Sequence, residues 1–120
     1  MKYMLLIYGN EQDRDGTKWE ECLQESTQLA RNLREAGQYL ASSPLHPTTT
    51  ATSVRVRDGK RLITDGPFAE TREQLGGYFL VQAPNLDEAI QIAGRIPGAR
   101  WGTVEVRPVV EIGGLPAARG

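Results

Sequence analysis

The segment 65–77 holds the densest group of residues that could carry chemistry. Its acidic, cationic and aromatic members fall within nine positions: Asp65, Phe68, Glu70, Arg72 and Glu73. Closely spaced carboxylates shift one another's pKa values and bind polar ligands, so these residues form the first candidate ligand site. We expect Arg72 to pair with a nearby carboxylate and Phe68 to anchor the segment in the core. A purely structural alternative stays open, because Asp65-Gly66-Pro67 is common turn chemistry.

His46, in a different segment, is a further candidate ligand-binding residue. It is the single histidine of the chain and lies between Pro44 and Pro47, in a stretch rich in Ser, Thr and Pro that predicts a long loop over 42–53. Imidazole titrates near neutral pH and long loops often carry function, so His46 could contact a ligand or move a proton. The structural alternative is an exposed histidine without a partner.

Metal binding is not expected. Glu11, Asp13, Asp15 and Gly16 have the spacing that begins a calcium loop, but Cys22 stands at the twelfth position, where a bidentate Glu is needed. The chain has a single cysteine and a single histidine, which are too few ligands for a structural zinc site. We therefore predict neither a metal nor another cofactor.

Nucleic-acid binding is not expected either. Four cations surround a predicted hairpin turn at Asp58-Gly59, namely Arg55, Arg57, Lys60 and Arg61. No aromatic side chain lies among them to stack on a base, and cations on a hairpin discourage edge-to-edge strand pairing. The pattern favours a solvated hairpin.

Apolar residues indicate which strands must position the candidate site. Segments 3–8 and 78–81 are apolar at both odd and even positions, which predicts two central strands. Residues 54–57 and 60–64 alternate in polarity around the Asp58-Gly59 turn, which predicts a hairpin. Pro108 places the last strand, 103–110, at an edge of the sheet.

Two amphipathic segments predict helices. The first extends from a capping box, Thr17 with Glu20, to Gly37, and the second from Asn85 to Gly94. The order strand, helix, hairpin, strand, helix, strand predicts an α+β fold, a ferredoxin-like sandwich of the dimeric α/β-barrel type. Its antiparallel sheet carries both helices on one face. The other face of the apolar central strands needs cover, and a homodimer would supply it.

Length and composition limit the remaining possibilities. A chain of 120 residues predicts a single domain over 1–112, followed by a flexible C-terminal tail over 113–120. The net charge of -1 gives no general attraction to nucleic acid or to anionic lipid. No apolar stretch approaches the roughly 20 residues that span a bilayer, and one cysteine cannot form an internal disulfide. We expect a cytoplasmic protein without membrane contact.

The candidate segment also resembles a known signature. Asp65-Gly66-Pro67-Phe68, followed by the run 70–78, resembles the signature of the DGPF-domain family, a branch of the YCII-related proteins. The resemblance continues through 86–89 and 102–108 and reaches back to 3–8, so it covers the chain up to Val110. It implies a dimeric ferredoxin-like fold in bacterial proteins of largely uncharacterised biochemistry. Such proteins are often encoded beside, or fused to, extracytoplasmic-function sigma factors.

The chain departs from the wider YCII group at the residues proposed for acid–base chemistry there. That group carries a histidine in the first helix and an aspartate before a proline that follows the second helix. Here the first helix has no histidine, and Ile96 precedes Pro97. The family's usual lysine in the signature segment is Arg72, which excludes a Schiff base. The group's chemistry should therefore not be carried over.

Three functions are compatible with these patterns. The leading one is a homodimer that binds a small polar ligand between the sheet and segment 65–77, with a regulatory role. The first alternative is a cofactor-free enzyme in which Asp65, Glu70 or Glu73 moves a proton on a small organic substrate. The second is a non-catalytic partner of a sigma factor. No catalytic residue is assigned.

Overall fold

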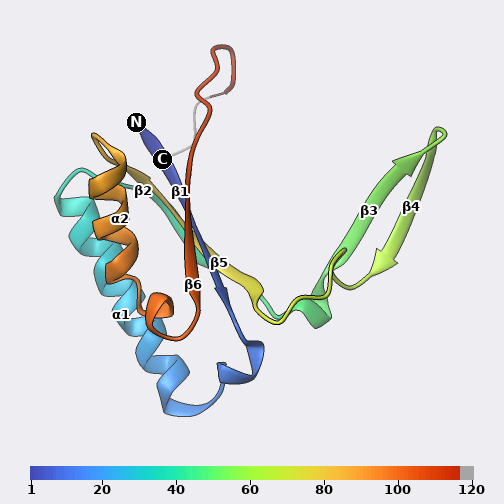
Figure 1. Cartoon of the computed structure of the whole chain (residues 1–120), viewed down its shortest axis with the longest axis horizontal. Coiled ribbons are helices and arrows are strands. Elements are labelled where there is room, and N and C mark those ends of the chain that lie inside the picture. The colour runs from blue at the N-terminus through green and yellow to red at the C-terminus, as the bar shows by residue number, and fades with distance from the viewer. Residues whose placement is uncertain (117–120) are drawn as a thin grey trace.

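Four strands form the main sheet, in the order β2-β5-β1-β6, with antiparallel pairing between all neighbours. The computed structural model describes residues 1–116 (Figure 1). The strands are β1 (Lys2–Gly9), β2 (Tyr39–Pro44), β5 (Gln74–Gln82) and β6 (Thr103–Pro108). The prediction that 3–8 and 78–81 are central and that the last strand is an edge is confirmed.

Two helices cover one face of this sheet. Helix α1 (Gly16–Glu35) and helix α2 (Leu86–Arg95) lie on the same side of the sheet in Figure 1. Between the helices and the sheet lies the core, whose largest members are Tyr3, Leu5, Leu29, Leu33, Phe79, Val81, Ile92 and Ile96. The predicted α+β, ferredoxin-like class is therefore confirmed.

The assignment of the second strand was wrong. The sequence predicted a loop from Ser42 to Ser53, but residues 39–44 form β2, which pairs with β5 at the edge of the main sheet. Ser42, Ser43 and Pro44 are poor strand formers, and the pairing with β5 overrides that local preference. Segment 65–77 is also shorter than predicted as a loop, because β5 begins at Gln74.

The hairpin forms as predicted but lies outside the main sheet. Strands β3 (Thr52–Arg57) and β4 (Lys60–Asp65) pair only with each other, as a separate two-stranded sheet that projects from the body of the molecule (Figure 1). Asp58 and Gly59 have φ values of 52° and 73°, the left-handed conformations that a tight hairpin turn requires. The turn chemistry was therefore predicted correctly, and the packing was not.

The first helix begins earlier than the predicted capping box. It begins at Gly16, so Asp15 occupies the N-cap position and Thr17 lies inside the first turn. The second helix follows the prediction, because the Asn85 side chain accepts a hydrogen bond from the Glu88 backbone N–H at 3.0 Å. Of the predicted C-terminal tail, residues 117–120 lie outside the described part of the chain.

Phe68 does not anchor the signature segment in the core. The chain has two phenylalanines; Phe79 is 3% exposed on the inner face of β5, whereas Phe68 is 81% exposed. The loop between β4 and β5 leads to the projecting hairpin, so it does not cross the helix-covered face of the sheet (Figure 1).

The two phenylalanines allow a matched test of this difference. Phe79→Ala should lower the free energy of unfolding by about 3 kcal/mol or more, because it truncates a buried aromatic side chain. Phe68→Ala should change it by less than about 0.5 kcal/mol. Urea denaturation of both variants measures the two values. A loss above about 2 kcal/mol for Phe68→Ala would show that this ring is buried after all.

Candidate functional site

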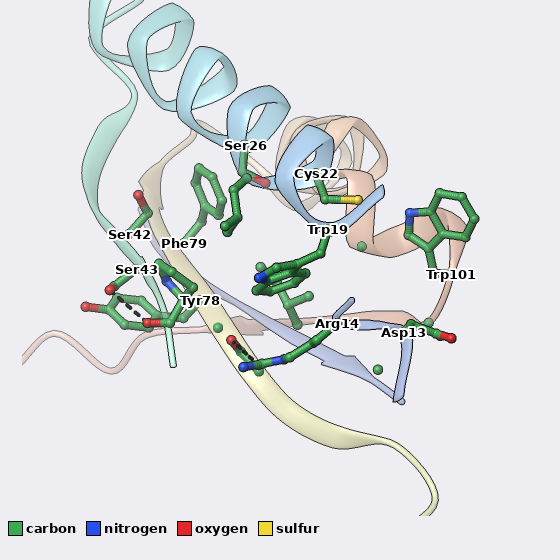
Figure 2. Close-up of a pocket in the computed structure, with 18 of the residues that line it drawn as sticks. Asp13, Arg14, Trp19, Cys22, Ser26, Ser42, Ser43, Tyr78, Phe79 and Trp101 are labelled. Atoms are coloured by element: carbon green, nitrogen blue, oxygen red, sulfur yellow. Dashed lines mark hydrogen bonds between the residues drawn. The ribbon is translucent and has the colours of Figure 1, made fainter. Parts of the chain in front are cut away.

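A cavity of about 560 Å³ lies between the N-terminal half of α1 and the main sheet (Figure 2). Its helical wall includes Trp19, Cys22 and Ser26, which are only partly buried, whereas the buried residues of α1 are Leu29 and Leu33. The C-terminal half of the helix therefore packs on the sheet, and the N-terminal half stands away from it.

Small residues on the sheet side leave room for this cavity. The facing wall includes Gly76 and Gly77 in β5, Ser42 in β2, and Gly98 in the 3₁₀ turn η3 (Pro97–Arg100). The buried residues of α2, Ala89, Ile92 and Ala93, do not line the cavity. A hollow of this size with mostly apolar walls is typical of small-ligand sites.

Arg14 closes one end of the cavity. Its Nη1 donates to the carbonyl of Leu45 at 2.6 Å and its Nη2 to the carbonyl of Gly76 at 3.1 Å. The guanidinium also lies 4.8 Å from the centre of the Trp19 ring. A Cβ on residue 76 would come within 2.6 Å of Nη2, so glycine there permits the close approach. Arg14 has no carboxylate within ion-pair distance among residues 1–116.

The neighbouring Glu11 reinforces this arrangement. It lies in the 3₁₀ turn η1 (Glu11–Asp13), and its carboxylate accepts hydrogen bonds from the backbone N–H and the hydroxyl of Thr48, at 2.7 and 2.5 Å. The hydroxyl bond lowers the pKa of Glu11 below its usual value. Thr48 begins the turn η2 (Thr48–Thr50), so this contact ties the loop before α1 to the chain that enters β3.

Contacts between α1 and the residues around η3 bound another side of the cavity. The ammonium of Lys18 lies 3.8 Å from the centre of the Trp101 ring. Farther along the helix, both guanidinium ends of Arg100 donate to Glu25 at 2.9 Å. These bonds lower the pKa of Glu25, and both side chains are about half exposed.

Neutral polar groups supply hydrogen bonding inside the cavity. The hydroxyl groups of Tyr39 and Ser42 lie 2.9 Å apart on β2, and Ser26 and Cys22 line the helical wall (Figure 2). No histidine or carboxylate from α1 reaches the lining; Asp13, from the preceding turn, is the acidic member. The arrangement can orient a polar group of a ligand, but it holds no acid–base pair of side chains.

The predicted site residues lie elsewhere. Asp65 ends β4, and Phe68, Glu70 and Arg72 follow in an exposed loop. Glu70 borders a smaller hollow of about 310 Å³, together with Thr48, Pro67, Ala69, Thr71 and Gln74. His46 is exposed after the end of β2 and lines neither hollow. The structure therefore does not bring these residues together at the large cavity.

Two contacts in that segment differ from the expectation. The carboxylate of Glu73 accepts a hydrogen bond from the Thr103 hydroxyl at 3.0 Å. This bond joins the residue directly before β5 to the first residue of β6. Arg72 forms no ion pair with a carboxylate in the part of the chain that the structure describes. The predicted pairing of Arg72 with a nearby carboxylate was therefore wrong.

Sequence reasoning missed the residues that line the cavity. Trp19, Cys22 and Ser26 lie within the first predicted amphipathic helix, but a periodic pattern does not reveal that part of the helix faces a cavity. The adjacent Gly76-Gly77 was the one available signal, because glycines inside a strand often mark a close approach of other groups. Arg14 gave none.

The chain was compared with known proteins. The sequence model of the YCII-related domain family matches residues 1–113 of this chain. This chain belongs to the YCII-related family. An uncharacterised protein of Rhizobium meliloti (strain 1021) is 36% identical over 114 residues, which cover 91% of this chain and 92% of that protein.

Two further observations on this YCII-related chain concern metal ligands and membrane-spanning helices. Among residues 1–116, no group of three or more His, Cys, Asp or Glu side chains is placed to hold a metal ion. No helix in that range is long and apolar enough to cross a membrane.

The contact between Glu25 and Arg100 makes stability depend on pH. The folded-state pKa of Glu25 is lowered from its ordinary value of 4.5, so the contribution is fully present above that value and is lost as pH falls through the folded-state pKa. Glu25→Gln should lower the free energy of unfolding near neutral pH by no more than about 0.5 kcal/mol, because the pair is half exposed. The difference from wild type should vanish in acid.

Thermal unfolding of the two proteins over a series of pH values measures this difference. Glu21→Gln is a matched control, because Glu21 is exposed on the same helix and takes part in no ion pair among the described residues. A difference between Glu25→Gln and wild type that persists in strong acid would mean that the contact is not electrostatic.

Proposed function

We propose that this protein is a homodimeric binding protein for a small organic ligand, which it holds in the cavity between α1 and the sheet. The cavity itself carries the proposal, since its volume of about 560 Å³ lies within the range of small-molecule sites. This location differs from the cleft beside segment 65–77 that the sequence favoured. The smaller hollow beside Glu70 is the alternative position.

The walls indicate the chemistry of the ligand. Trp19, Leu23 and Phe79 would pack on an apolar or aromatic body, and the hydroxyl pair of Tyr39 and Ser42 would hold a polar group. Arg14 forms no ion pair among the described residues, although its charge contributes to the lowered pKa of Glu11, so it can still donate to an anionic or strongly accepting end of the ligand. A small amphipathic anion fits these groups best.

Binding is favoured over catalysis because the cavity lining, as the structure describes it, contains no histidine and a single carboxylate, that of Asp13. Residues at the positions that carry the wider group's acid–base pair are different here, and the carboxylates of Asp65, Glu70 and Glu73 are not part of the cavity lining. General acid–base chemistry needs a titrating group within hydrogen-bond reach of the reacting atom.

The finer assignment to the DGPF branch rests on the signature Asp65-Gly66-Pro67-Phe68 and the run that follows it. A regulatory role, and association with an extracytoplasmic-function sigma factor, are predictions from that resemblance.

The homodimer is proposed from the uncovered face of the main sheet. Residues that alternate with the buried Tyr3 and Leu5 point to this face, and cross-strand pairs join Met4 to Leu80 and Leu6 to Tyr78. No helix among residues 1–116 covers them (Figure 1), although the sequence of these strands is as apolar as that of strands buried on both faces. Packing against the same face of a second copy would bury it on both sides.

Filling the cavity tests the ligand site. Ser26→Leu should weaken binding of the fluorescent aromatic anion 8-anilinonaphthalene-1-sulfonate at least about tenfold, because the larger side chain occupies the apolar space. Gln24→Leu is the matched control, since Gln24 is exposed on α1 and should leave binding unchanged. Titration by fluorescence measures both affinities, and mass spectrometry of denatured protein shows whether a co-purified molecule is lost from Ser26→Leu. Equal binding by both variants would place the site elsewhere.

The dimer has a separate test. Leu80→Asp should convert the dimer to a folded monomer, because it puts a charge at the centre of the uncovered face. Phe79→Asp is no substitute, since Phe79 is buried in the helix-covered core and its replacement should unfold the chain. Light scattering after gel filtration gives the mass, with Gln24→Asp as the control. A wild-type mass near 13.2 kDa at all micromolar concentrations would refute the dimer.

A further inference from the structure

No other strand among residues 1–116 pairs with the projecting hairpin. We call residues 52–65 the arm; they comprise β3, the turn and β4. Every residue of the two strands except Ser53 is exposed, and the arm stands away from the main sheet (Figure 1). The radius of gyration is 16.0 Å, against about 13.6 Å for a compact chain of this length.

The arm is amphipathic in a way that implies burial of one face. Val54 lies directly opposite Ile63, and Val56 lies beside them on the same face. Val54 is 58% exposed, Ile63 is 59% exposed and Val56 is 62% exposed. The other face carries most of the cations, Arg55, Arg57 and Lys60, together with Leu62. Alternation of this kind is typical of hairpins with one covered face, and an isolated two-stranded hairpin is only marginally stable in water.

Charge indicates what covers the apolar face. The arm contains Arg55, Arg57, Lys60 and Arg61 against Asp58 and Asp65, a net charge of 4 − 2 = +2. The rest of the chain has 14 − 4 = 10 cations against 15 − 2 = 13 acids, a net charge of −3. The arm of one copy is therefore complementary to the body of another. In a two-fold symmetric dimer this exchange would cover both arms at once.

We propose that the arm packs its face of Val54, Val56 and Ile63 on the body of a second copy of this chain. The proposal rests on the homodimer proposed above and adds a second contact to the one at the sheet. Nucleic acid is the poorer occupant, because phosphates would take the basic face and leave the three apolar side chains in water. The second copy buries the apolar face and leaves most of the cations at the rim.

Two neighbouring residues of β4 provide a matched pair of variants. Ile63→Thr removes apolar surface from the docking face, and Leu62→Thr makes the same kind of change on the opposite face, where the side chain is 49% exposed. Each change occurs twice in a symmetric dimer. Ile63→Thr should raise the dimer dissociation constant at least about tenfold, and Val54→Thr with Ile63→Thr about a hundredfold. Leu62→Thr should change it less than about threefold. Sedimentation equilibrium measures the constants.

Amide hydrogen exchange of the arm gives a second readout that does not depend on variants. The backbone N–H groups of β3 and β4 should be protected when wild-type protein is concentrated enough to be dimeric, and should exchange rapidly after dilution to monomer. A dimer whose arm exchanges rapidly at all concentrations would overturn the arm proposal and leave the sheet contact intact. Protection in the diluted monomer, or protection that appears only when a DNA duplex is added, would also overturn it.

The outcomes separate this inference from the proposed function. Equal dissociation constants for Ile63→Thr and Leu62→Thr would refute the arm contact alone. A protein that is monomeric throughout would refute the arm and the sheet contact together. Binding of 8-anilinonaphthalene-1-sulfonate at the α1 cavity is measured independently in either case.

Discussion

The loop before α1 holds together parts of the fold that lie far apart in the sequence. Arg14 reaches the carbonyls of Leu45 and Gly76, the second of which is 62 positions away, and Glu11 binds Thr48. The end of β2, the beginning of β5 and the turn before the arm are therefore all positioned from one short segment. Charge-assisted hydrogen bonds to backbone groups are stronger than neutral ones, so this loop fixes both the end of the cavity and the base of the arm.

Local patterns predicted the parts of the fold that local forces determine. The apolar runs of β1 and β5, Pro108 in the edge strand and Asp58-Gly59 in the hairpin each led to the correct element. Strand β2 was missed because Ser42 and Pro44 suit a loop, and only pairing with β5 makes them part of a strand. The position of the arm outside the main sheet was missed for the same reason, since alternating polarity predicts a hairpin without showing which strands it pairs with.

The candidate site was harder to predict, because it depends on where elements fail to touch. Segment 65–77 was predicted as the site because charged and aromatic residues are closely spaced in it. The larger cavity is instead lined by a helix, two glycines and hydroxyl groups that form no sequence motif. The distance between α1 and the sheet follows from Leu29 and Leu33 packing at one end of the helix and Arg14 holding its loop at the other. Such a distance is a property of the folded chain and has no local signal in the sequence.

Helix α1 is held unevenly along its length, and this has a kinetic consequence. Its C-terminal half is fixed by buried leucines, whereas its contacts with the residues around η3 are a cation–π pair and a half-exposed ion pair. Surface contacts of this kind contribute little and weaken with salt. Salt should therefore loosen the side of α1 that faces η3, while the loop held by Arg14 and the leucine-packed half of the helix stay in place. A molecule bound in the cavity should then enter and leave on the η3 side, at a rate that rises with ionic strength.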